Sequence, residues 1–263
     1  MTTDTAPPQV DAAPPTSAPL YLSRLTLDPR DRAVQRDLAD CRDLHRTVLR
    51  AFPDLRETPD TGDDNAPGDG AHGARRRFSL LYRLDESPSG LPVVLVQSGA
   101  YPDWGTLRGR SARYLLKEAD IKDVAASYSA LTAGRMLTFK LHANPTKKVD
   151  PRQDKDPERR NGRRVVLVKE EEHLAWIVRK GEQCGFELVR RGDGSPTVQV
   201  SPVQRVVGHG SPDTRTFGAV TFGGVLRVTD ATLLRAALVV GIGSGKEYGF
   251  GLLSLARVRG MNP

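Results

Sequence analysis

Alternation of apolar and polar residues marks out the elements of the first half of the chain. Residues 20–28 (LYLSRLTLD) alternate with a period of two, which predicts a half-buried strand. An amphipathic helix is predicted over 33–52, because its apolar residues recur at helical spacing (Leu44, Val48, Leu49 and Phe52). A second helix is predicted over 117–131, and further strands at 77–84, 92–98 and 135–144. The order of elements is therefore β-α-β-β-α-β.

The second half resembles a degenerate copy of the first. A strand over 164–169 leads into a helix over 170–185, and a last helix and strand follow at 230–240 and 252–258. Between them lies strand-rich sequence at 186–191, 197–207 and 216–230. We therefore predict an α+β fold of two tandem ferredoxin-like βαββαβ domains, the topology that RNA-recognition motifs share.

Composition sets the limits of these predicted domains. Residues 1–19 are rich in Pro, Ala and Thr, so we expect a disordered tail. The N-terminal domain is assigned to 20–143 and the C-terminal domain to 144–263. Within the first domain, residues 54–75 are rich in Asp, Gly and Pro without any period, which is typical of a mobile loop.

The charge balance favours a polyanionic partner. The chain has 263 residues, with 39 Lys and Arg against 32 Asp and Glu and a net charge of +7. No apolar run approaches the roughly 20 residues of a membrane span, and the N-terminus lacks the pattern of a signal peptide. Cys41 and Cys184 are the only cysteines, which predicts a reducing cytoplasmic location without a disulfide framework.

The densest positive charge lies between the two predicted domains. From 140 to 164 the sequence has nine Lys and Arg against four acidic residues, and three prolines prevent a continuous helix. Such a segment can follow a phosphate backbone, although charge alone equally fits a solvated surface loop. Aromatic residues are scarce here, which favours a folded RNA duplex over stacked single strands. The predicted RNA contacts are His142, Lys147, Lys148, Arg159, Arg160, Arg163 and Arg164.

One histidine lies in a sequence suited to phosphate chemistry. His45 follows Arg42 by three residues, so both lie on one face of the predicted helix, and Arg46 is adjacent. An imidazole exchanges a proton near neutral pH, and guanidinium groups stabilise a pentacoordinate phosphate. RNA can be cut in this way without a metal, because its own 2′-hydroxyl is the nucleophile. The alternative is a helix-surface histidine with no chemical role. No spacing resembles a zinc site, so we expect neither metal nor cofactor.

A glycine-rich segment near the C-terminus, 241–251 (GIGSGKEYGFG), raises further alternatives. A nucleotide-binding P-loop is disfavoured, because Lys246 is followed by Glu247 instead of Ser or Thr, and Val240 stands where the first glycine belongs. The segment can instead cap the preceding helix. Its five glycines also suit close approach to another backbone, such as a phosphate chain.

Four segments, spread along nearly the whole chain after residue 20, belong together: YLSRL at 21–25 with DLHRTVLRAFP at 43–53, FKLHANPTKK at 139–148, LVKEEEHLAWIVRKG at 167–181, and FGGVLRVTD at 222–230 with GIGSGKEYGFGLLSLARV at 241–258. In this order they resemble the CasE family, the CRISPR repeat-cleaving endoribonucleases of type I-E systems. The resemblance implies two ferredoxin-like domains that bind the hairpin of a CRISPR repeat transcript. It also implies metal-independent cleavage at the 3′ base of the stem, leaving a 5′-hydroxyl and a 2′,3′-cyclic phosphate.

The resemblance implies roles for particular residues and partners. The family's helix histidine corresponds to His45, and its glycine-rich loop implies RNA contacts for Gly243, Gly245 and Lys246. Such proteins keep their product and join the Cascade complex, so other Cascade subunits are expected partners, and a membrane is not. Some members carry a tyrosine at the position of Arg42. Because a guanidinium is a poor general base, this departure keeps open the alternative of a non-catalytic RNA-binding subunit.

Overall fold

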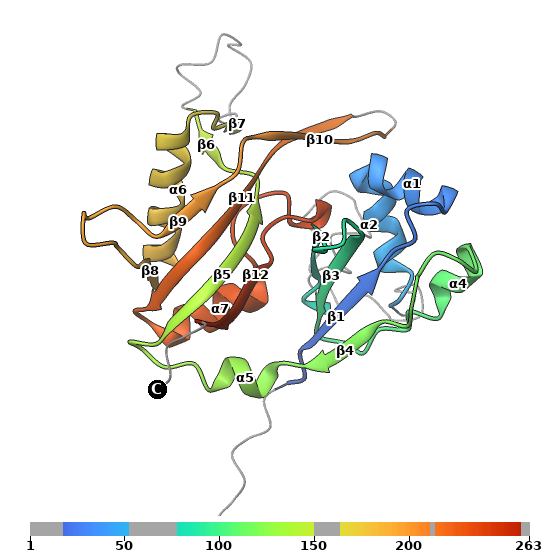
Figure 1. Cartoon of the computed structure of the whole chain (residues 1–263), viewed down its shortest axis with the longest axis horizontal. Helices are drawn as coiled ribbons and strands as arrows, with labels where there is room; N and C mark the ends of the chain where they lie inside the picture. The colour runs from blue at the N-terminus through green and yellow to red at the C-terminus, as the bar shows by residue number, and fades with distance from the viewer. Residues whose placement is uncertain (1–17, 53–77, 150–163, 211–213, 259–263) are drawn as a thin grey trace, which may run out of the picture.

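Two antiparallel sheets, each with its own helices, form two units that lie side by side in the computed structural model (Figure 1). The structure describes residues 18–52, 78–149, 164–210 and 214–258. The predicted mobile loop at 54–75 lies outside these ranges, as does all but the end of the predicted tail at 1–19.

The first unit has the strand order β2-β3-β1-β4, with antiparallel neighbours throughout. Its elements are β1 (Tyr21–Thr26), α1 (Arg32–Ala39), α2 (Cys41–Leu49), β2 (Leu81–Glu86), β3 (Pro92–Ser98), α4 (Thr106–Arg110) and β4 (Asp120–Asp123). A short helix, α5 (Ala125–Ser129), follows and connects this unit to the next. This is the order of a ferredoxin-like unit, in which the first strand lies between the third and the fourth.

The second unit repeats that order with β10-β11-β5-β12. Its main elements are β5 (Met136–Ala143), α6 (Glu170–Gln183), β8 (Phe186–Leu188), β9 (Val198–Val200), β10 (Gln204–Gly208), β11 (Arg215–Val228), α7 (Ala231–Val240), the 3-10 helix η3 (Lys246–Tyr248) and β12 (Leu253–Arg257). The long strand β11 pairs with β5 on one side and with β8, β9 and β10 on the other. The predicted α+β fold of two ferredoxin-like units is confirmed.

The last strand predicted for the first half belongs to the second sheet. β5, predicted at 135–144, pairs with β11 and β12. The strand that completes the first sheet is β4, which lies where a helix over 117–131 was predicted, and only α5 in that range is helical. The helix prediction was wrong because β4 (DIKD) is a polar edge strand with one half-buried residue and no apolar alternation. We therefore propose that the two units divide before β5, not at 143/144.

Two other elements differ from prediction. The helix predicted over 33–52 is interrupted at Asp40, whose extended backbone (φ −138°, ψ 116°) ends α1 and begins α2. The strand predicted at 164–169 is β7 (Arg164–Val166), which pairs with β6 (Thr146–Lys148) in a separate hairpin outside both main sheets. This hairpin carries part of the predicted basic segment.

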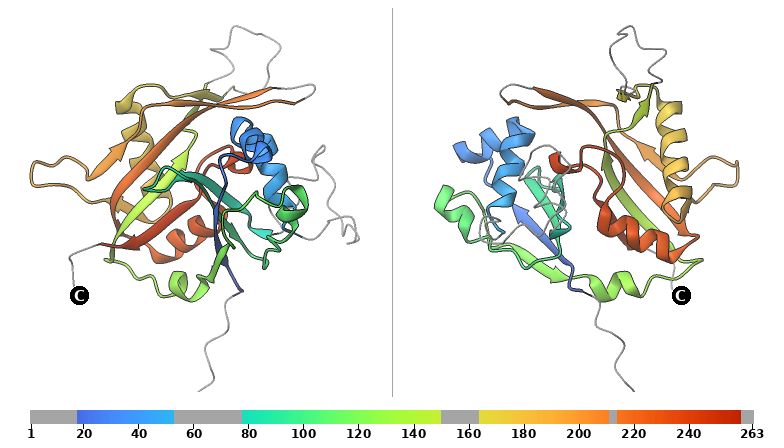
Figure 2. Two further views of the ribbon diagram at one scale, coloured as in Figure 1. Left: turned by 45° about the vertical axis from the view of Figure 1, so that its right-hand side comes forward. Right: turned by 180° about the vertical axis from the view of Figure 1, so that it is seen from behind.

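Each sheet buries one face against its helices. In β5 the buried residues Leu137, Phe139, Leu141 and Ala143 alternate with more exposed ones, and they pack with Trp176, Ile177 and Phe222 in the core of the second unit. The core of the first unit gathers Leu25, Val34, Leu44, Val48, Phe52 and Trp104. α6 and α7 therefore cover one face of the second sheet, as the views in Figure 2 show.

Buried polar side chains join the two units. Nη1 of Arg83 on β2 donates to the carbonyl oxygens of Lys140 (3.0 Å) and Leu252 (3.1 Å) in the second unit. Nε2 of Gln97 on β3 donates to the carbonyl of Leu238 at 2.8 Å. These directed bonds satisfy buried groups, and they fix the first unit against β5, α7 and the start of β12.

Candidate active site and nucleic-acid interface

His45 is carried by α2 at the junction of the two units. The helix begins at Asp40, whose Oδ1 accepts hydrogen bonds from the backbone N–H groups of Arg42 (2.8 Å) and Asp43 (3.3 Å). The predicted amphipathic pattern turns the apolar side of the helix to the core of the first unit. His45 is itself buried, with 6 % exposure, so it is not the surface histidine of the alternative interpretation.

The ring of His45 contacts two tyrosines that come from different units. The ring centroid lies 6.3 Å from that of Tyr82 on β2 and 6.0 Å from that of Tyr248, the last residue of η3. Both ring nitrogens of His45 are buried, so a phosphate reaches them only when neighbouring side chains move aside. The first unit thus supplies the histidine, and the glycine-rich loop of the second unit supplies a tyrosine that packs beside it.

Tyr82 ties that loop to the start of α2. Its hydroxyl donates to the carbonyl of Glu247 (2.9 Å) and lies 3.4 Å from the carbonyl oxygen of Cys41. Burial raises the pKa of Tyr82 well above its usual value, and nearby Cys41, Tyr248 and Glu247 act in the same direction. The phenol therefore remains a hydrogen-bond donor and holds the loop beside the helix.

A second tie joins α2 to the β10–β11 hairpin, which reaches toward α1 and α2 in Figure 1. Oδ2 of Asp40 accepts from the backbone N–H of His209 and lies 2.8 Å from its ring Nδ1. Burial raises the pKa of Asp40, but the hydrogen bonds from His209 and from the helix outweigh it, so the pKa is lowered. Gly208 permits this approach, because a Cβ there would lie 2.8 Å from Sγ of Cys41.

The two arginines predicted beside His45 take different positions. Arg46 pairs with Asp43 on the same helix, and 69 % of its side chain is exposed. Arg42 packs against β10, where a Cβ on Gly208 would lie 3.0 Å from its Cγ. Stabilisation of a phosphate by either residue remains a prediction.

A basic groove of about 660 Å³ lies beside the glycine-rich loop. Its basic residues come from β6, β7, α6 and the loop, and are Lys147, Lys148, Arg164, Arg179, Lys180 and Lys246. Four of them, and also Gly243, are RNA contacts predicted from the sequence. The sequence analysis missed Arg179 and Lys180, although the charge separation along α6, from an acidic first turn to a basic last turn, was a usable signal.

One acidic residue tempers the charge of the groove. Nζ of Lys147 lies 3.0 Å from Oε1 of Glu172. The hydrogen bond from Lys147 lowers the pKa of this exposed carboxyl, so Glu172 stays ionised and partly neutralises the lysine. The net charge of the lining is nevertheless positive.

The glycines of the loop have backbone conformations that other residues rarely adopt. Gly245 has a φ of +75°, and a Cβ there would lie 2.9 Å from the ring of Phe250. Gly241 ends α7, as the capping alternative predicted. Gly243 lines the groove, whereas Gly245 packs within the loop, so its predicted RNA contact remains untested.

His142 is held inside the second unit. Its Nδ1 lies 2.9 Å from Oγ1 of Thr221, and its ring stacks on Phe250 with centroids 5.1 Å apart. Burial lowers the pKa of His142 to about 4, so the ring is neutral near pH 7 and adds no charge to a nucleic-acid surface. Its predicted RNA contact remains a prediction. Arg159, Arg160 and Arg163 lie outside the described residues.

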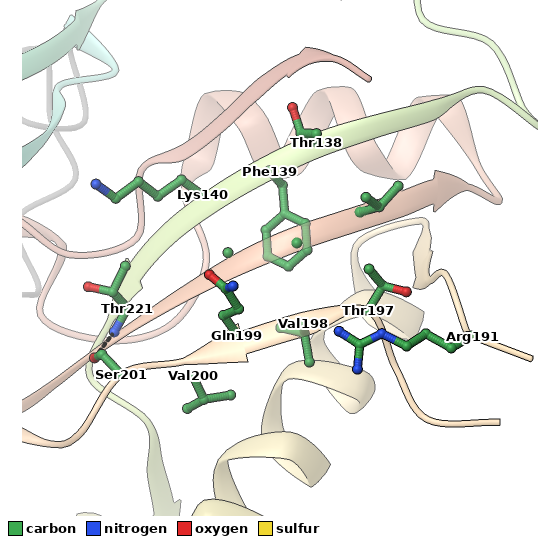
Figure 3. Close-up of a pocket in the computed structure, with 13 residues that line it drawn as sticks. Thr138, Phe139, Lys140, Arg191, Thr197, Val198, Gln199, Val200, Ser201 and Thr221 are labelled. Atoms are coloured by element: carbon green, nitrogen blue, oxygen red, sulfur yellow. Dashed lines mark hydrogen bonds between the residues drawn. The ribbon is translucent and has the colours of Figure 1, made fainter. Parts of the chain in front are cut away.

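A separate cavity of about 680 Å³ lies along β5, β11 and β9, away from His45 (Figure 3). Lys140, Gln199 and Arg191 stand around it, and the backbone N–H of Thr221 donates to Oγ of Ser201 at 2.9 Å. None of the predicted site residues that the structure describes lines it.

The described part of the chain contains neither a metal-binding cluster nor a helix that could span a membrane. No group of three or more His, Cys, Asp or Glu side chains there could hold a metal ion. No helix in the described ranges has both the length and the apolar character needed to cross a membrane.

Comparison with known proteins adds independent information. A sequence profile described as "CRISPR associated protein" matches residues 20–257. The chain is 34 % identical to the CRISPR-associated endoribonuclease Cse3 of Thermus thermophilus, with 90 % of this chain and 100 % of the relative covered. It is 35 % identical to the CRISPR system Cascade subunit CasE of Escherichia coli, with 90 % and 99 % covered.

A solved structure supports the same grouping. The Thermus thermophilus Cse3 structure bound to an RNA representing a pre-cleavage complex superposes with a TM-score of 0.71 at 32 % identity. The superposition covers 90 % of this chain and 99 % of that one. The similarity therefore extends over both units and the junction that carries His45.

Proposed function

The chain belongs to the family of CRISPR-associated proteins, and we propose that it is a metal-independent endoribonuclease of CRISPR repeat RNA. It binds the hairpin of the repeat transcript and cuts at the 3′ base of the stem. One observation carries this proposal: the glycine-rich loop lines the basic groove through Gly243 and Lys246 and contacts His45 through Tyr248. An RNA duplex bound in the groove would therefore extend along the loop toward His45.

The chemistry requires no metal. The 2′-oxygen attacks the adjacent phosphorus, the bond to the 5′-oxygen breaks, and the products carry a 2′,3′-cyclic phosphate and a 5′-hydroxyl. His45 acts in proton transfer at this phosphate, because an imidazole can take and give a proton near neutral pH. Arg42 and Arg46 stabilise the charge that develops on the non-bridging oxygens.

The groove supplies the binding energy. Its lysines and arginines neutralise backbone phosphates, a sequence-independent interaction that suits an A-form stem. Arg159, Arg160 and Arg163 belong to the sequence between β6 and β7, and we assign them to the same stem. A narrow set of base contacts near the cut would then select the repeat.

The cleaved RNA stays bound, and the protein enters a Cascade-type complex with other Cascade subunits. The relatives support this assignment, since one of them is a Cascade subunit. We place the protein in the cytoplasm, where a CRISPR transcript is available and where the free cysteines Cys41 and Cys184 remain reduced.

The test is cleavage of a hairpin repeat RNA in excess EDTA by the wild type and by His45→Ala. A second RNA carries a 2′-deoxy sugar just upstream of the cut. We expect the wild type to cut only the ribose substrate, and His45→Ala to lose at least about 100-fold in rate while binding RNA normally.

Other outcomes separate the alternatives. Tight binding by the wild type without any cut would favour the non-catalytic RNA-binding subunit, with Arg42 as the first residue to examine. Equal cutting by His45→Ala would remove His45 from the mechanism.

A further inference from the structure

Self-cleavage of RNA requires two proton transfers at one phosphate. A base removes the proton of the attacking 2′-hydroxyl, and an acid protonates the leaving 5′-oxygen. His45 can perform one of these steps. The neighbouring arginines cannot perform the other, because a guanidinium stays protonated in proteins. A second titratable group close to His45 would supply the other proton transfer.

Tyr248 is placed to be that group. Its ring centroid lies 6.0 Å from that of His45, with the planes tilted by 55°. η3, which carries it, is bounded by Gly245 and Gly249, both in the left-handed region. The ring also lies 5.0 Å from that of Phe217 on β11. Backbone geometry and packing thus place the phenol beside the histidine.

The hydrogen bond between Arg215 and Tyr248 leaves the hydroxyl proton of the tyrosine available for transfer. Nη1 of Arg215 donates to the phenol oxygen at 3.4 Å, a bond that uses this oxygen as an acceptor. The guanidinium carbon lies 5.9 Å from the centre of the tyrosine ring. The positive charge of Arg215 attracts a phosphate to the same place.

Three other titratable side chains near this site, all in the described part of the chain, already have hydrogen-bond or packing partners. The Tyr82 hydroxyl is buried and donates to the carbonyl of Glu247. The ring of His209 is bonded to Asp40 at the start of α2. His142 packs between Thr221 and Phe250. Tyr248 is half-buried, and its hydroxyl contacts the exposed Arg215. A phosphate at the surface can therefore reach the hydroxyl, which also lies close to His45.

We propose that Tyr248 is the general acid of the cleavage reaction and His45 its general base. This inference rests on the proposed function and assigns a second catalytic residue to the same site. The 2′-hydroxyl proton passes to His45 as the new bond from the 2′-oxygen to phosphorus forms. The bond from phosphorus to the 5′-oxygen breaks, and the Tyr248 proton passes to that oxygen. The phenolate regains a proton from solvent, and the imidazolium loses one.

The test compares Tyr248→Phe with the wild type under single-turnover conditions in EDTA. Phenylalanine keeps the ring contacts with His45 and Phe217 and removes only the hydroxyl. We expect the cleavage rate to fall about 100-fold, with unchanged affinity for the 2′-deoxy RNA and an unchanged melting temperature. The matched control is Tyr101→Phe, an exposed tyrosine that packs on Tyr21 and should cleave at the wild-type rate.

A second substrate identifies the step. Replacing the leaving 5′-oxygen by sulfur removes the need for an acid, because a thiolate leaves without being protonated. We expect this RNA to restore wild-type rates to Tyr248→Phe but not to His45→Ala.

The outcomes separate this inference from the function on which it rests. A Tyr248→Phe protein that cuts the ordinary RNA at the wild-type rate would overturn the role of Tyr248 alone. Equal slowing on both substrates would also overturn it, because the hydroxyl would not then protonate the leaving group. A wild type that does not cut either RNA would instead refute the proposed endoribonuclease.

Discussion

Arg83 is one of the side chains that join the two units directly. It is 3 % exposed, and besides its two carbonyl acceptors in the second unit it pairs with Asp85 at 2.9 Å. Lys140 pairs with the same carboxylate at 2.7 Å. A buried guanidinium requires this counter-charge, so the carboxylate of Asp85 indirectly supports the junction at which His45 lies.

Replacing Asp85 by Asn should therefore destabilise the protein strongly. We expect the free energy of unfolding at pH 7 to fall by about 3 kcal/mol, since Arg83 would remain buried without its partner. Urea denaturation measures the change. The control is Asp120→Asn, which breaks a solvent-exposed pair with Lys117 and should lower the free energy of unfolding far less than Asp85→Asn does. Similar losses in both variants would contradict this role for Arg83.

The contribution of Asp85 should also depend on pH. Burial raises its pKa, but Arg83 and Lys140 outweigh burial, so the pKa lies below the usual value of 3.8. A lowered pKa in the folded state means that the stabilisation is present above about pH 4 and is lost as the pH falls through the folded pKa. The difference in free energy of unfolding between the wild type and Asp85→Asn should therefore be constant from pH 7 to 5 and shrink in stronger acid. A difference that grows on acidification would refute the assignment.

Among the elements, α2 shows most clearly what the pattern along the chain could and could not predict. The spacing of Leu44, Val48 and Phe52 identified the helix and its buried face, because that signal is local. The break at Asp40 was missed, since the apolar pattern continues across it. The contact of Asp40 with His209 joins residues 169 positions apart, so no local pattern contains it.

Asp40 both begins α2 and holds the β10–β11 hairpin, so its removal should affect stability and cleavage together. We expect Asp40→Ala to lower the free energy of unfolding by about 2 kcal/mol, the upper range for a lost N-cap, and to slow cleavage. Asp40→Asn, which still caps the helix, should recover most of the stability. Thermal melts and single-turnover rates measure the two effects.

Asp230 offers the matched control, because it caps α7 through Thr232 and Leu233 without contacting α2. Asp230→Ala should lose a similar stability and keep the cleavage rate. If the two alanine variants slow cleavage equally, Asp40 has no specific role at the site.

For the whole molecule, the sequence predicted the fold class and most of the strands, but it grouped β5, which pairs in the second sheet, with the first half of the chain. Counting elements along the chain could not decide whether β5 closed the first sheet or opened the second, because its apolar alternation suits both. The basic residues of β6, β7 and the loop were predicted one by one. Their meeting in a single groove with Arg179 and Lys180 depends on tertiary packing.

That groove predicts a salt dependence. The double variant Arg179→Ala/Lys180→Ala should bind hairpin RNA more weakly. The slope of log affinity against log salt concentration should become shallower by roughly 1 to 2, because fewer counterions are released when the protein neutralises fewer phosphates. Titrations at several salt concentrations measure the slope. The charge-matched control Lys117→Ala/Lys122→Ala changes exposed residues of the first unit and should keep the slope. Equal slopes for the two double variants would exclude the groove from binding.

The most direct test of the central claim is the mass of the cleavage products. Hairpin repeat RNA would be incubated with the wild type in excess EDTA, and both fragments would be analysed by mass spectrometry. We predict a single cut at the 3′ base of the stem, with a 2′,3′-cyclic phosphate on one fragment and a 5′-hydroxyl on the other, and no product with His45→Ala. A 5′-phosphate with a 3′-hydroxyl, or cleavage that requires a divalent metal, would contradict the account.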